Sequence, residues 1–455
     1  MELCSFIVTC MSTISNKILA GVLLIALSGS MNAFSQDPEH KNTLTLLEVW
    51  KRTATYNKQL QMQQLKVQSA DERVKTAKSE KLPEVSANGM YGRFSNFTLY
   101  EDGLLKAPTQ IPIEKKGTYK VNGEAYFNLY NGGKLNREIT AATTETELAK
   151  EQKNLTESEI RFKAAAYYLD IYRNEQYESV MLQDISEREK ELEEIRQLLQ
   201  NGVVLKSDVL RAELKLSKQR MTLLEIRNSL KIATQRLNIM MGAPDTAIIH
   251  VAADTVDLSS QQRTYEDFLQ DAYTHSFEFK ISEKETKLSE IKLQQVKANI
   301  LPKVGLFAEY NYSYPEIILY PYSFNPYGLG MAGVKASLPI SQLYLNKHRK
   351  AEAKINLMRQ EIEHSDTQDR VREEVRSAYL RYTEAITRIQ VAKENIAQAQ
   401  ENFRIVNNTY FNQLSLLTDL LDAETQLLQS RFDLTTAQVT AQLQYYQLLK
   451  ATGNL

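Results

Sequence analysis

The stretch LLQNGVVLKSDVLRAE, residues 198–213, breaks an otherwise continuous run of strong helix formers. Dozens of residues without proline lie on both sides, yet the middle holds Gly202, the β-branched pair Val203 and Val204, and then Ser207. Glycine commonly ends a helix, and serine commonly caps the start of the next one. We therefore expect one long helix to end here and another to begin, with Ser207 as its N-cap.

The same break occurs a second time further along the chain. SDVLRAE at residues 207–213 matches TDLLDAE at 418–424, an offset of 211, which makes Thr418 the expected N-cap of the second returning helix. Thr45 and Thr264 lie 219 positions apart, and each is followed three residues later by an acidic residue, as a capping box requires. Self-similarity over such a long period predicts two internal repeats.

Both repeats carry their elements in the same order. A helix of about 35 residues, ended by Pro83 or Pro302, is followed by two extended segments, a very long helix, the break and a second long helix. Residues 134–200 alone would form a helix about 100 Å long, and leucines at every seventh position predict coiled-coil packing. The predicted boundaries are 36–241 for the first repeat, 242–263 for an irregular inter-repeat segment and 264–455 for the second repeat.

The extended segments have the pattern of membrane strands. TYKVNGEAYFNLY, residues 118–130, alternates apolar and polar residues over a length that would cross a bilayer as a tilted strand, and KVGLFAEYNYSY, residues 303–314, does the same. Each chain thus offers about four such strands, too few to close a barrel, and lipid does not tolerate an open edge. Either the strands pack in a soluble sandwich, or several copies close one barrel together; three copies would supply twelve strands. The aromatic strand ends favour the barrel.

The N-terminus favours export. Residues 1–35 predict a cleaved signal peptide, because Lys17 precedes the apolar run ILAGVLLIALSG and Ser35 offers a small residue for cleavage. Translation from Met11 rather than Met1 would give a more ordinary signal. The alternative, a membrane anchor helix, would need a longer apolar run. Both cysteines lie in or before this run, so the mature chain would have none.

Several function classes find no support in the residues. The formal net charge of −1 gives no basic excess for nucleic acid. GLGMAG at residues 328–333 matches a dinucleotide fingerprint, but without the strand and helix that hold a pyrophosphate, so small residues of a barrel strand explain it better. The five histidines have no metal-ligand spacing, and no nucleophile elbow or P-loop is present. We expect no catalytic residue, no cofactor and no metal.

The breaks admit two interpretations. Each can be a plain turn of a helical hairpin. Alternatively, two such tips per chain form the open end of a helical tube when several copies assemble. Asp208, Asp419 and Asp422 would then repeat around its mouth, where rings of carboxylates favour cations and can act as a gate.

Three stretches of the first repeat, with weaker counterparts in the second, resemble a known family. They read TLLEVW…KLPEVSANGMYGRF, FNLYNGGKLNREITAA and NGVVLKSDVLRAELKL…LNIMMG. Over essentially the whole mature chain, their order is similar to that of TolC-type outer-membrane efflux proteins, the outer-membrane factors. The resemblance implies an α+β membrane protein: a homotrimer with a 12-stranded β-barrel, four strands per chain, in the lipid of a Gram-negative outer membrane. A long α-helical barrel would continue it into the periplasm.

The resemblance also implies a function and partners. The trimer would be a passive channel, the exit duct of a tripartite efflux pump or a type I secretion system. Its tips would dock on a periplasmic adaptor (membrane fusion) protein bound to an inner-membrane pump such as the RND or ABC type, which would supply the energy. The alternative is a secreted or surface coiled-coil scaffold or adhesin without a transport lumen, which would need no membrane-facing strand and no paired tips.

The resemblance finally assigns residues to two tasks, and two positions depart from the family pattern. The family's lock arginine falls at Ser415, and Gln413 replaces a usual glycine, so we expect the closed state to be held differently or less tightly. The periplasmic gate would comprise Asp208, Tyr410, Asp419 and Asp422, and the adaptor contact Gly202, Val203, Val204, Leu205, Gln413, Leu414 and Ser415.

Overall fold

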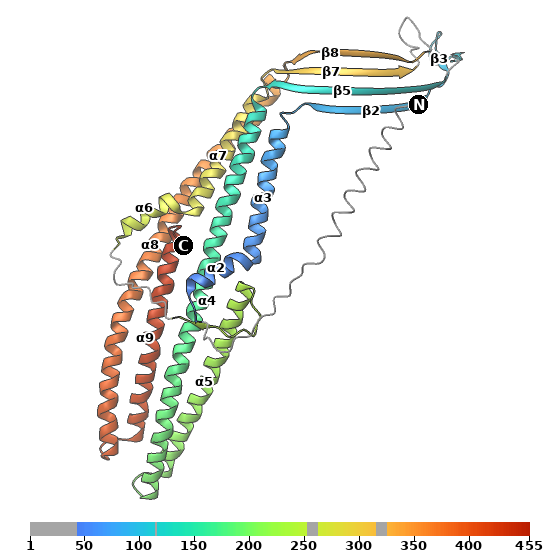
Figure 1. Ribbon diagram of the computed structural model, residues 1–455. Coiled ribbons are helices and arrows are strands. Elements are labelled where there is room, and N and C mark those ends of the chain that lie inside the picture. Colours follow the sequence, from blue (N-terminus) through green and yellow to red (C-terminus); the bar gives the residue numbers. More distant parts are fainter. Residues whose placement is uncertain (1–42, 114–115, 253–262, 315–324) are drawn as a thin grey trace, which may run out of the picture. The chain divides into compact units, whose positions relative to one another are not determined.

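The computed structural model describes residues 43–113, 116–252, 263–314 and 325–455, and it consists of long helices and one four-stranded sheet (Figure 1). The predicted signal peptide lies outside the described residues. Among the described helices, none combines the length and the apolar character that crossing a membrane requires.

Equivalent helices of the two halves have nearly equal lengths, which confirms the duplication. They contain 11 and 11, 22 and 22, 67 and 70, and 36 and 35 residues. In the first half they are α2 (Leu46–Tyr56), α3 (Lys58–Ser79), α4 (Lys134–Gln200) and α5 (Lys206–Met241). In the second half they are α6 (Tyr265–His275), α7 (Phe277–Ala298), α8 (Gln342–Phe411) and α9 (Leu417–Ala451).

The single helix of about 35 residues that we expected at the start of each half is wrong, because two helices stand there. Asn57 is extended, with ψ of 122°, and its side-chain oxygen accepts hydrogen bonds from the N–H groups of Gln59 and Leu60 at 2.9 and 3.3 Å. Ser276 is extended at the equivalent junction, with ψ of 125°. Thr45 and Thr264 do cap α2 and α6 through capping boxes, as predicted.

The four long strands form one antiparallel sheet that joins the two halves. Its order is β2 (Glu84–Arg93), β5 (Gly117–Asn131), β7 (Lys303–Tyr314) and β8 (Tyr327–Ser337). The central pair, β5 and β7, places Val121 opposite Tyr312 and Glu124 opposite Glu309. Because neighbouring strands match apolar with apolar positions, the alternation predicted for each strand continues across the sheet.

One face of this sheet is almost free of charge. Within the described strands, the only charged residue on it is Arg93, the last residue of β2. The opposite face carries Glu84, Lys120, Glu124, Lys303, Glu309 and Lys335. The uncharged face contains Val85, Ala87, Gly89 and Tyr91 of β2, Tyr119, Val121, Gly123, Ala125 and Phe127 of β5, Val304, Leu306, Ala308, Tyr310, Tyr312 and Tyr314 of β7, and Gly328, Gly330, Ala332, Val334 and Ala336 of β8.

The glycines of the sheet make room for aromatic rings. A Cβ added at Gly305 would lie 2.5 Å from the Tyr126 hydroxyl, and one at Gly328 would collide with the hydroxyl of Tyr310. One at Gly333 would lie 3.2 Å from the Phe307 ring. The fingerprint-like GLGMAG therefore lies inside β8, where it packs rings from the neighbouring strand.

Two small pairs of strands were not predicted from the sequence. β1 (Thr43–Leu44) pairs in parallel with β6 (His250–Val251). We expected the segment 242–263 to be irregular throughout, and this short strand is the exception. Tyr168 of α4 secures this pair, its hydroxyl lying 3.0 and 2.8 Å from the carbonyl oxygens of Leu44 and Ala252. β3 (Phe97–Leu99) and β4 (Thr109–Ile111) form a short hairpin between β2 and β5.

The long helices pair as two antiparallel hairpins, α4 with α5 and α8 with α9, whose turns lie at the same end (Figure 1). The seven-residue spacing predicted from the sequence lies along their buried seams: Leu216, Leu223 and Leu237 are buried on α5, and Leu427, Ala441 and Leu448 on α9. A buried cluster near the turns, which includes Ile195, Val209, Tyr410 and Leu420, contains residues from all four helices. This cluster connects the four helices near the turns, where the candidate site lies.

Candidate functional site

The first tip, residues 201–205, reverses the chain at a glycine. Gly202 has φ of +73°, the N–H of Gly202 donates to the carbonyl of Leu199 at 2.9 Å, and the N–H of Val203 donates to that of Leu198 at 2.9 Å. This is the Schellman arrangement, in which a left-handed residue satisfies the last carbonyls of the helix. The predicted break between two helices is thus present, and Gly202 has the task of ending α4.

The predicted N-caps of the returning helices are wrong by two positions. α5 begins at Lys206 after Leu205, and α9 begins at Leu417 after Leu416, so Ser207 and Thr418 lie inside the first turn. The capping oxygens come from the aspartates one residue later: Asp208 accepts from the Leu205 N–H at 3.2 Å, and Asp419 from the Leu416 N–H at 3.1 Å. The helix dipole also favours a carboxylate in the first turn. The two aspartates therefore cap the helices in place of Ser207 and Thr418.

The second tip, residues 412–416, has the same geometry without a glycine. Gln413 has φ of +63°, its N–H donates to the Tyr410 carbonyl at 2.8 Å, and the N–H of Leu414 donates to that of Thr409 at 2.8 Å. A left-handed conformation costs a residue with a Cβ about 1–2 kcal/mol. A side-chain hydrogen bond also links this tip to the end of α8: the Ser415 hydroxyl accepts a hydrogen bond from the Thr409 hydroxyl at 3.2 Å.

Replacing Gln413 with glycine is expected to stabilise the protein by about 1 kcal/mol, because glycine adopts the left-handed conformation without the steric cost. Gly202→Ala, at the equivalent position of the other tip, should destabilise it by a similar amount. No atom lies within 4 Å of a Cβ added at Gly202, so that effect would be conformational. Urea unfolding followed by circular dichroism measures both variants. A loss of stability in Gln413→Gly would show that Gln413 is not strained.

A cleft of about 400 Å³ lies between the two tips. Its apolar rim is strongly exposed, with Leu205 71% and Leu416 70% accessible. Leu414, on the second tip, does not line the cleft and is 78% accessible. Among the predicted site residues, Val203, Val204, Leu205, Asp208, Tyr410, Gln413 and Ser415 line this cleft, together with Leu198, Ser207, Arg211, Phe411, Leu416, Leu417 and Thr418. Arg211 is a cleft residue that the sequence reading missed.

The structure brings two predicted gate residues, Asp208 and Tyr410, together across the tips. Tyr410 is only 7% exposed, and its hydroxyl has no hydrogen-bond partner among the described residues. Burial raises the pKa of Tyr410, and the nearby carboxylate of Asp208 raises it further. Asp419 and Asp422 lie instead on exposed positions of α9 and do not line this cleft.

Further along the hairpins, a buried polar layer joins them. Arg188 of α4 is 8% exposed and pairs with Glu424 of α9, which is 3% exposed. Arg188 also pairs with Glu191, and its Nε lies 3.7 Å from a carboxylate oxygen of Asp184. Gln219 of α5 donates to the other oxygen of Asp184. The layer therefore links both helices of the first hairpin to α9.

A second cross-link, from Lys215 of α5, extends this polar layer. Its ammonium donates to the Thr425 hydroxyl on α9 at 2.5 Å. Burial lowers the pKa of Lys215, and the carboxylates of Asp184 and Asp422 oppose that change. Asp422, predicted as a gate residue, thus faces a lysine of the other hairpin within the same chain.

The charges of the polar layer depend on one another. Burial raises the pKa of Asp184, and the charge of Arg188 opposes this; burial lowers the pKa of Arg188, and the charge of Asp184 opposes that. Even so, three buried atoms of the layer lack a hydrogen-bond partner in the described structure: Arg188 Nε, Gln219 Oε1 and Glu424 Oε2. A buried charge without its partner is costly, so we expect the loss of one member of the layer to weaken the link between the hairpins.

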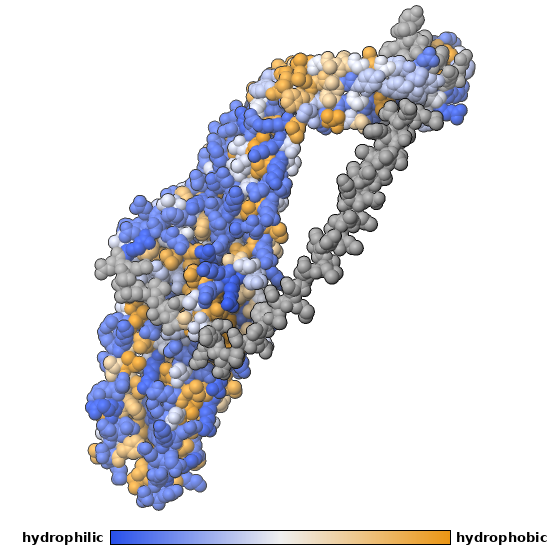
Figure 2. Space-filling view, in the orientation of Figure 1, coloured by the Kyte–Doolittle hydropathy of each residue, from blue (hydrophilic) through white to orange (hydrophobic). Residues whose placement is uncertain are grey.

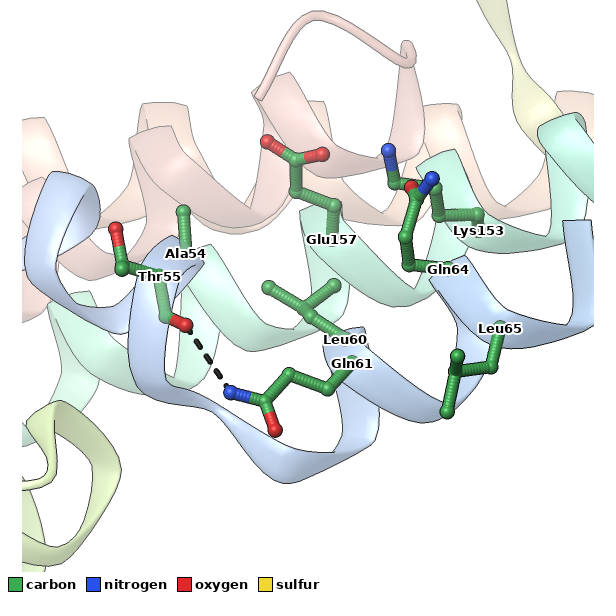
Figure 3. A pocket seen from close by; sticks show the side chains of 8 residues that line it. All are labelled: Ala54, Thr55, Leu60, Gln61, Gln64, Leu65, Lys153 and Glu157. Carbon is green, nitrogen blue, oxygen red and sulfur yellow. Dashed lines mark hydrogen bonds between the residues drawn. The ribbon is translucent and has the colours of Figure 1, made fainter. Parts of the chain in front are cut away.

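A hollow of about 530 Å³ lies away from the tips, where α2 meets α3 (Figure 3). Gln61 donates to the Thr55 carbonyl across the bend at 3.2 Å, and Leu60, Leu65, Lys153 and Glu157 also line the hollow.

The described residues contain no group of three or more histidine, cysteine, aspartate or glutamate side chains that could hold a metal.

Comparison with known proteins agrees with this architecture. The family model described as outer membrane efflux protein matches residues 51–243 and 268–454, one match in each half. No curated protein matches the sequence.

Solved structures share the fold at low sequence identity. CusC has a TM-score of 0.75 at 16% identity, covering 90% of this chain and 92% of its own. The outer membrane protein VceC from Vibrio cholerae has a TM-score of 0.72 at 17% identity, covering 90% and 96%. The outer membrane channel MtrE of Neisseria gonorrhoeae, in an open state, has a TM-score of 0.71 at 18% identity, covering 90% and 88%.

The predicted fold, with long helices, a four-stranded sheet per chain and two repeats, is therefore confirmed, and so is the resemblance to TolC-type proteins. The matched family is one of efflux channels, which are non-enzymatic transport proteins. The chain belongs to the outer membrane efflux protein family, and it is an outer-membrane channel of an efflux system that extends into the periplasm.

Proposed function

We propose that three copies of this chain close one 12-stranded barrel and one helical tube, and that the trimer is the passive exit duct of a tripartite efflux pump or type I secretion system. The observation that carries this proposal is the sheet with two open edges, β2 and β8. In an antiparallel sheet of four strands the first and last run in opposite directions, so β8 of one copy can pair antiparallel with β2 of the next. Closure in this way leaves no edge in the lipid.

The two faces of the sheet support the same arrangement. The uncharged face suits lipid, and the face with Lys120, Glu124 and Glu309 suits a water-filled lumen. Figure 2 shows apolar residues gathered over the part of the sheet that adjoins the helices. There Val85 of β2 is 75% and Val334 of β8 66% exposed, so both edge strands carry unburied apolar side chains.

The helices have matching unpartnered edges. α5 exposes Leu210, Leu214, Met221 and Leu224, whose spacing places them along one side of the helix. α3 exposes Met62 and Leu65, the latter at the hollow in Figure 3. α8 exposes a third set, Ile355, Met358, Ile362, Leu380 and Val391. Contacts between different surfaces of identical copies form a ring when the rotation from copy to copy closes. In the proposed trimer, the edge of α3 and α5 would pack against α8 of the next copy.

The proposed assembly is tested on the detergent-solubilised protein. Native mass spectrometry should give three times the mass of the mature chain, and the outer-membrane fraction should hold oligomers that heat dissociates. A monomer, or a rod found only in soluble fractions, would contradict the trimer and favour the scaffold.

The exposed rims of the two tips support a docking role. In the proposed pump, Leu205 and Leu414 contact the helical hairpin of a periplasmic adaptor, because the two adjacent tips together carry several exposed apolar side chains. The other proposed contacts are Gly202, Val203, Val204, Gln413 and Ser415. The adaptor would in turn bind an inner-membrane pump of the RND or ABC type, which supplies the energy.

The proposed gate comprises Asp208, Tyr410, Asp419 and Asp422. The closed state of this chain, which has Ser415 in place of an arginine, would rest on the polar layer around Arg188, while Asp208 and Tyr410 line the cleft between the tips. Opening would then separate the α8–α9 hairpin from the α4–α5 hairpin.

Replacing Asp419 and Asp422 together with alanine is expected to reduce block of the channel by multivalent cations while changing conductance little, since the ring of carboxylates would be lost. Planar-bilayer recordings with a trivalent cation on the tip side measure the block. Because Asp419 also caps α9, the double asparagine variant is the control: it keeps an acceptor for the Leu416 N–H and removes only the charge. Undiminished block in both variants would remove the two aspartates from the gate.

A further inference from the structure

The four junctions between helices and strands concentrate positive charge. They are residues 75–84, 131–138, 292–303 and 335–354, and the strand register places all four at one end of the sheet (Figure 1). Together they contain thirteen lysine and arginine residues against four glutamates, although the whole chain has a net charge of −1. Lys303 and Lys335 lie within strands, on the charged face of the sheet, and we call the other eleven residues the basic collar.

The opposite end of the sheet has no such excess. The segments 93–117 and 314–327, which connect the strands there, contain four basic and four acidic residues. The charge is therefore a property of the helix side of the sheet, and a general need for solubility at strand ends does not explain it.

The collar is available for binding. Lys347, Arg349 and Lys350 at the start of α8 are exposed, and none forms an ion pair with another described residue. Buried Asn346 donates to the Val296 carbonyl of α7 at 2.7 Å, which fixes the orientation of this first part of α8. Elsewhere in the collar Lys75 pairs with Glu72 at 2.7 Å.

The collar adjoins the uncharged face of the sheet. Between the end of β8 and the cations of α8 lie Leu338, Ile340 and Tyr344, which are 57%, 67% and 67% exposed. Lys347 follows the start of α8 by five residues, which corresponds to about 8 Å of helix. The headgroup region of a bilayer leaflet is about 5–8 Å thick, so the first cations of α8 would lie at headgroup depth when the sheet spans the hydrocarbon.

We propose that the basic collar binds the phosphate groups of anionic phospholipids in the inner leaflet of the outer membrane. Ammonium and guanidinium groups beside an apolar band match a headgroup phosphate joined to acyl chains. The inference rests on the proposed barrel and its orientation, with the helices on the periplasmic side. Bound lipid would seal the outside of the barrel where β2 and β8 of neighbouring copies meet.

The test uses the full-length trimer in mild detergent, titrated with dioleoylphosphatidylglycerol or dioleoylphosphatidylcholine, and native mass spectrometry counts the bound lipid. The collar variant is Lys347→Gln, Arg349→Gln, Lys350→Gln. The matched control, Lys218→Gln, Lys231→Gln, Lys393→Gln, removes three exposed cations from α5 and α8 far from the sheet.

We expect the wild-type trimer to prefer phosphatidylglycerol by about a hundredfold, since each of the three cations substituted in the collar variant contributes on the order of fivefold near a membrane surface. The collar variant should lose about a hundredfold of this preference, and the control should keep it. Equal binding of both lipids by the wild type, or an equal loss in the control, overturns the proposal.

A second measurement distinguishes failure of the lipid proposal from failure of the proposed function. It also distinguishes lipid from the cell wall as the anionic partner of the collar. Collar-variant trimers should keep their mass and their bilayer conductance, and isolated cell-wall sacculi should sediment them as they do the wild type. Conducting trimers without lipid preference would overturn the collar alone, whereas absence of trimers would overturn both proposals. Loss of sacculus binding with an unchanged lipid preference would assign the surface to the cell wall instead.

Discussion

Arg188→Met is expected to destabilise the protein by about 3–5 kcal/mol, the usual cost of removing one partner of a buried ion pair. Glu424 and Asp184 would remain buried without the cation that compensates them. Both carboxylates are almost completely buried, so the loss is far larger than the lost attraction of a surface pair. Urea unfolding of the trimer followed by circular dichroism measures the effect.

An exposed ion pair between α4 and α5 provides the control. Arg220 pairs with Glu189 at 2.6 Å, but both side chains are about half exposed, so Arg220→Met should cost no more than about 1 kcal/mol. The double variant Arg188→Met, Glu424→Leu should recover much of the loss, because it leaves fewer uncompensated charges. Equal costs for Arg188→Met and Arg220→Met would show that the polar layer does not hold the hairpins together.

The Arg188 variants also test how the entrance is held. If the polar layer limits the separation of the hairpins, Arg188→Met trimers that still fold at low temperature should open more often in bilayer recordings. Arg220→Met trimers should keep the wild-type open fraction. A stability loss without any change in opening would leave the polar layer a structural role only.

Leu205→Asp is expected to abolish efflux while leaving trimers intact. The side chain is 71% exposed in the chain, so a carboxylate there costs little in folding. In the proposed complex it would be buried against the adaptor without a partner, which weakens binding by about 3 kcal/mol or more, at least a hundredfold. Accumulation of a fluorescent efflux substrate in cells, and recovery of the cross-linked adaptor with the trimer, measure the outcome.

The matched control places the same charge at the other end of the molecule. Leu105, between β3 and β4, is fully exposed, and Leu105→Asp should leave efflux unchanged. If Leu205→Asp cells exported substrate normally with wild-type amounts of trimer, the tips would not be the adaptor contact.

Much of the fold was predictable because its signals are local and occur twice. The alternation from Tyr119 to Leu129 marks a strand by its period of two, and the leucines at Leu216 and Leu223 mark a helical seam by their period of seven. The break at Gly202 was readable because glycine so often ends a helix. Its partner at Gln413 was found only by the offset of 211, since glutamine gives no such signal.

The wrong predictions concern positions where tertiary packing or a neighbouring side chain determines the local structure. α2 packs on α4 and α5, and its Val49 and Thr53 are buried. We attribute the bend at Asn57 to this packing, since the segment otherwise favours one continuous helix. The N-caps were misplaced because Asp208 and Asp419 accept the hydrogen bonds for which serine and threonine are the usual candidates.

The polar layer was missed because its partners lie far apart in the sequence. Arg188 and Glu424 are 236 positions apart, and charged residues on a long helix usually face water. One signal was present: Glu424 falls between Leu420 and Leu427 at helical spacing, on the stripe that turns out to be buried. A charge at such a position marks a candidate for a buried pair.

Recording the purified trimer in a planar lipid bilayer tests most directly that copies of this chain enclose one water-filled passage. The expected result is stepwise conductance, one step per inserted trimer, with block by a multivalent cation added from the tip side only. Intact trimers that insert into the bilayer and give no conductance steps, even after Arg188→Met loosens the tips, would contradict a continuous lumen.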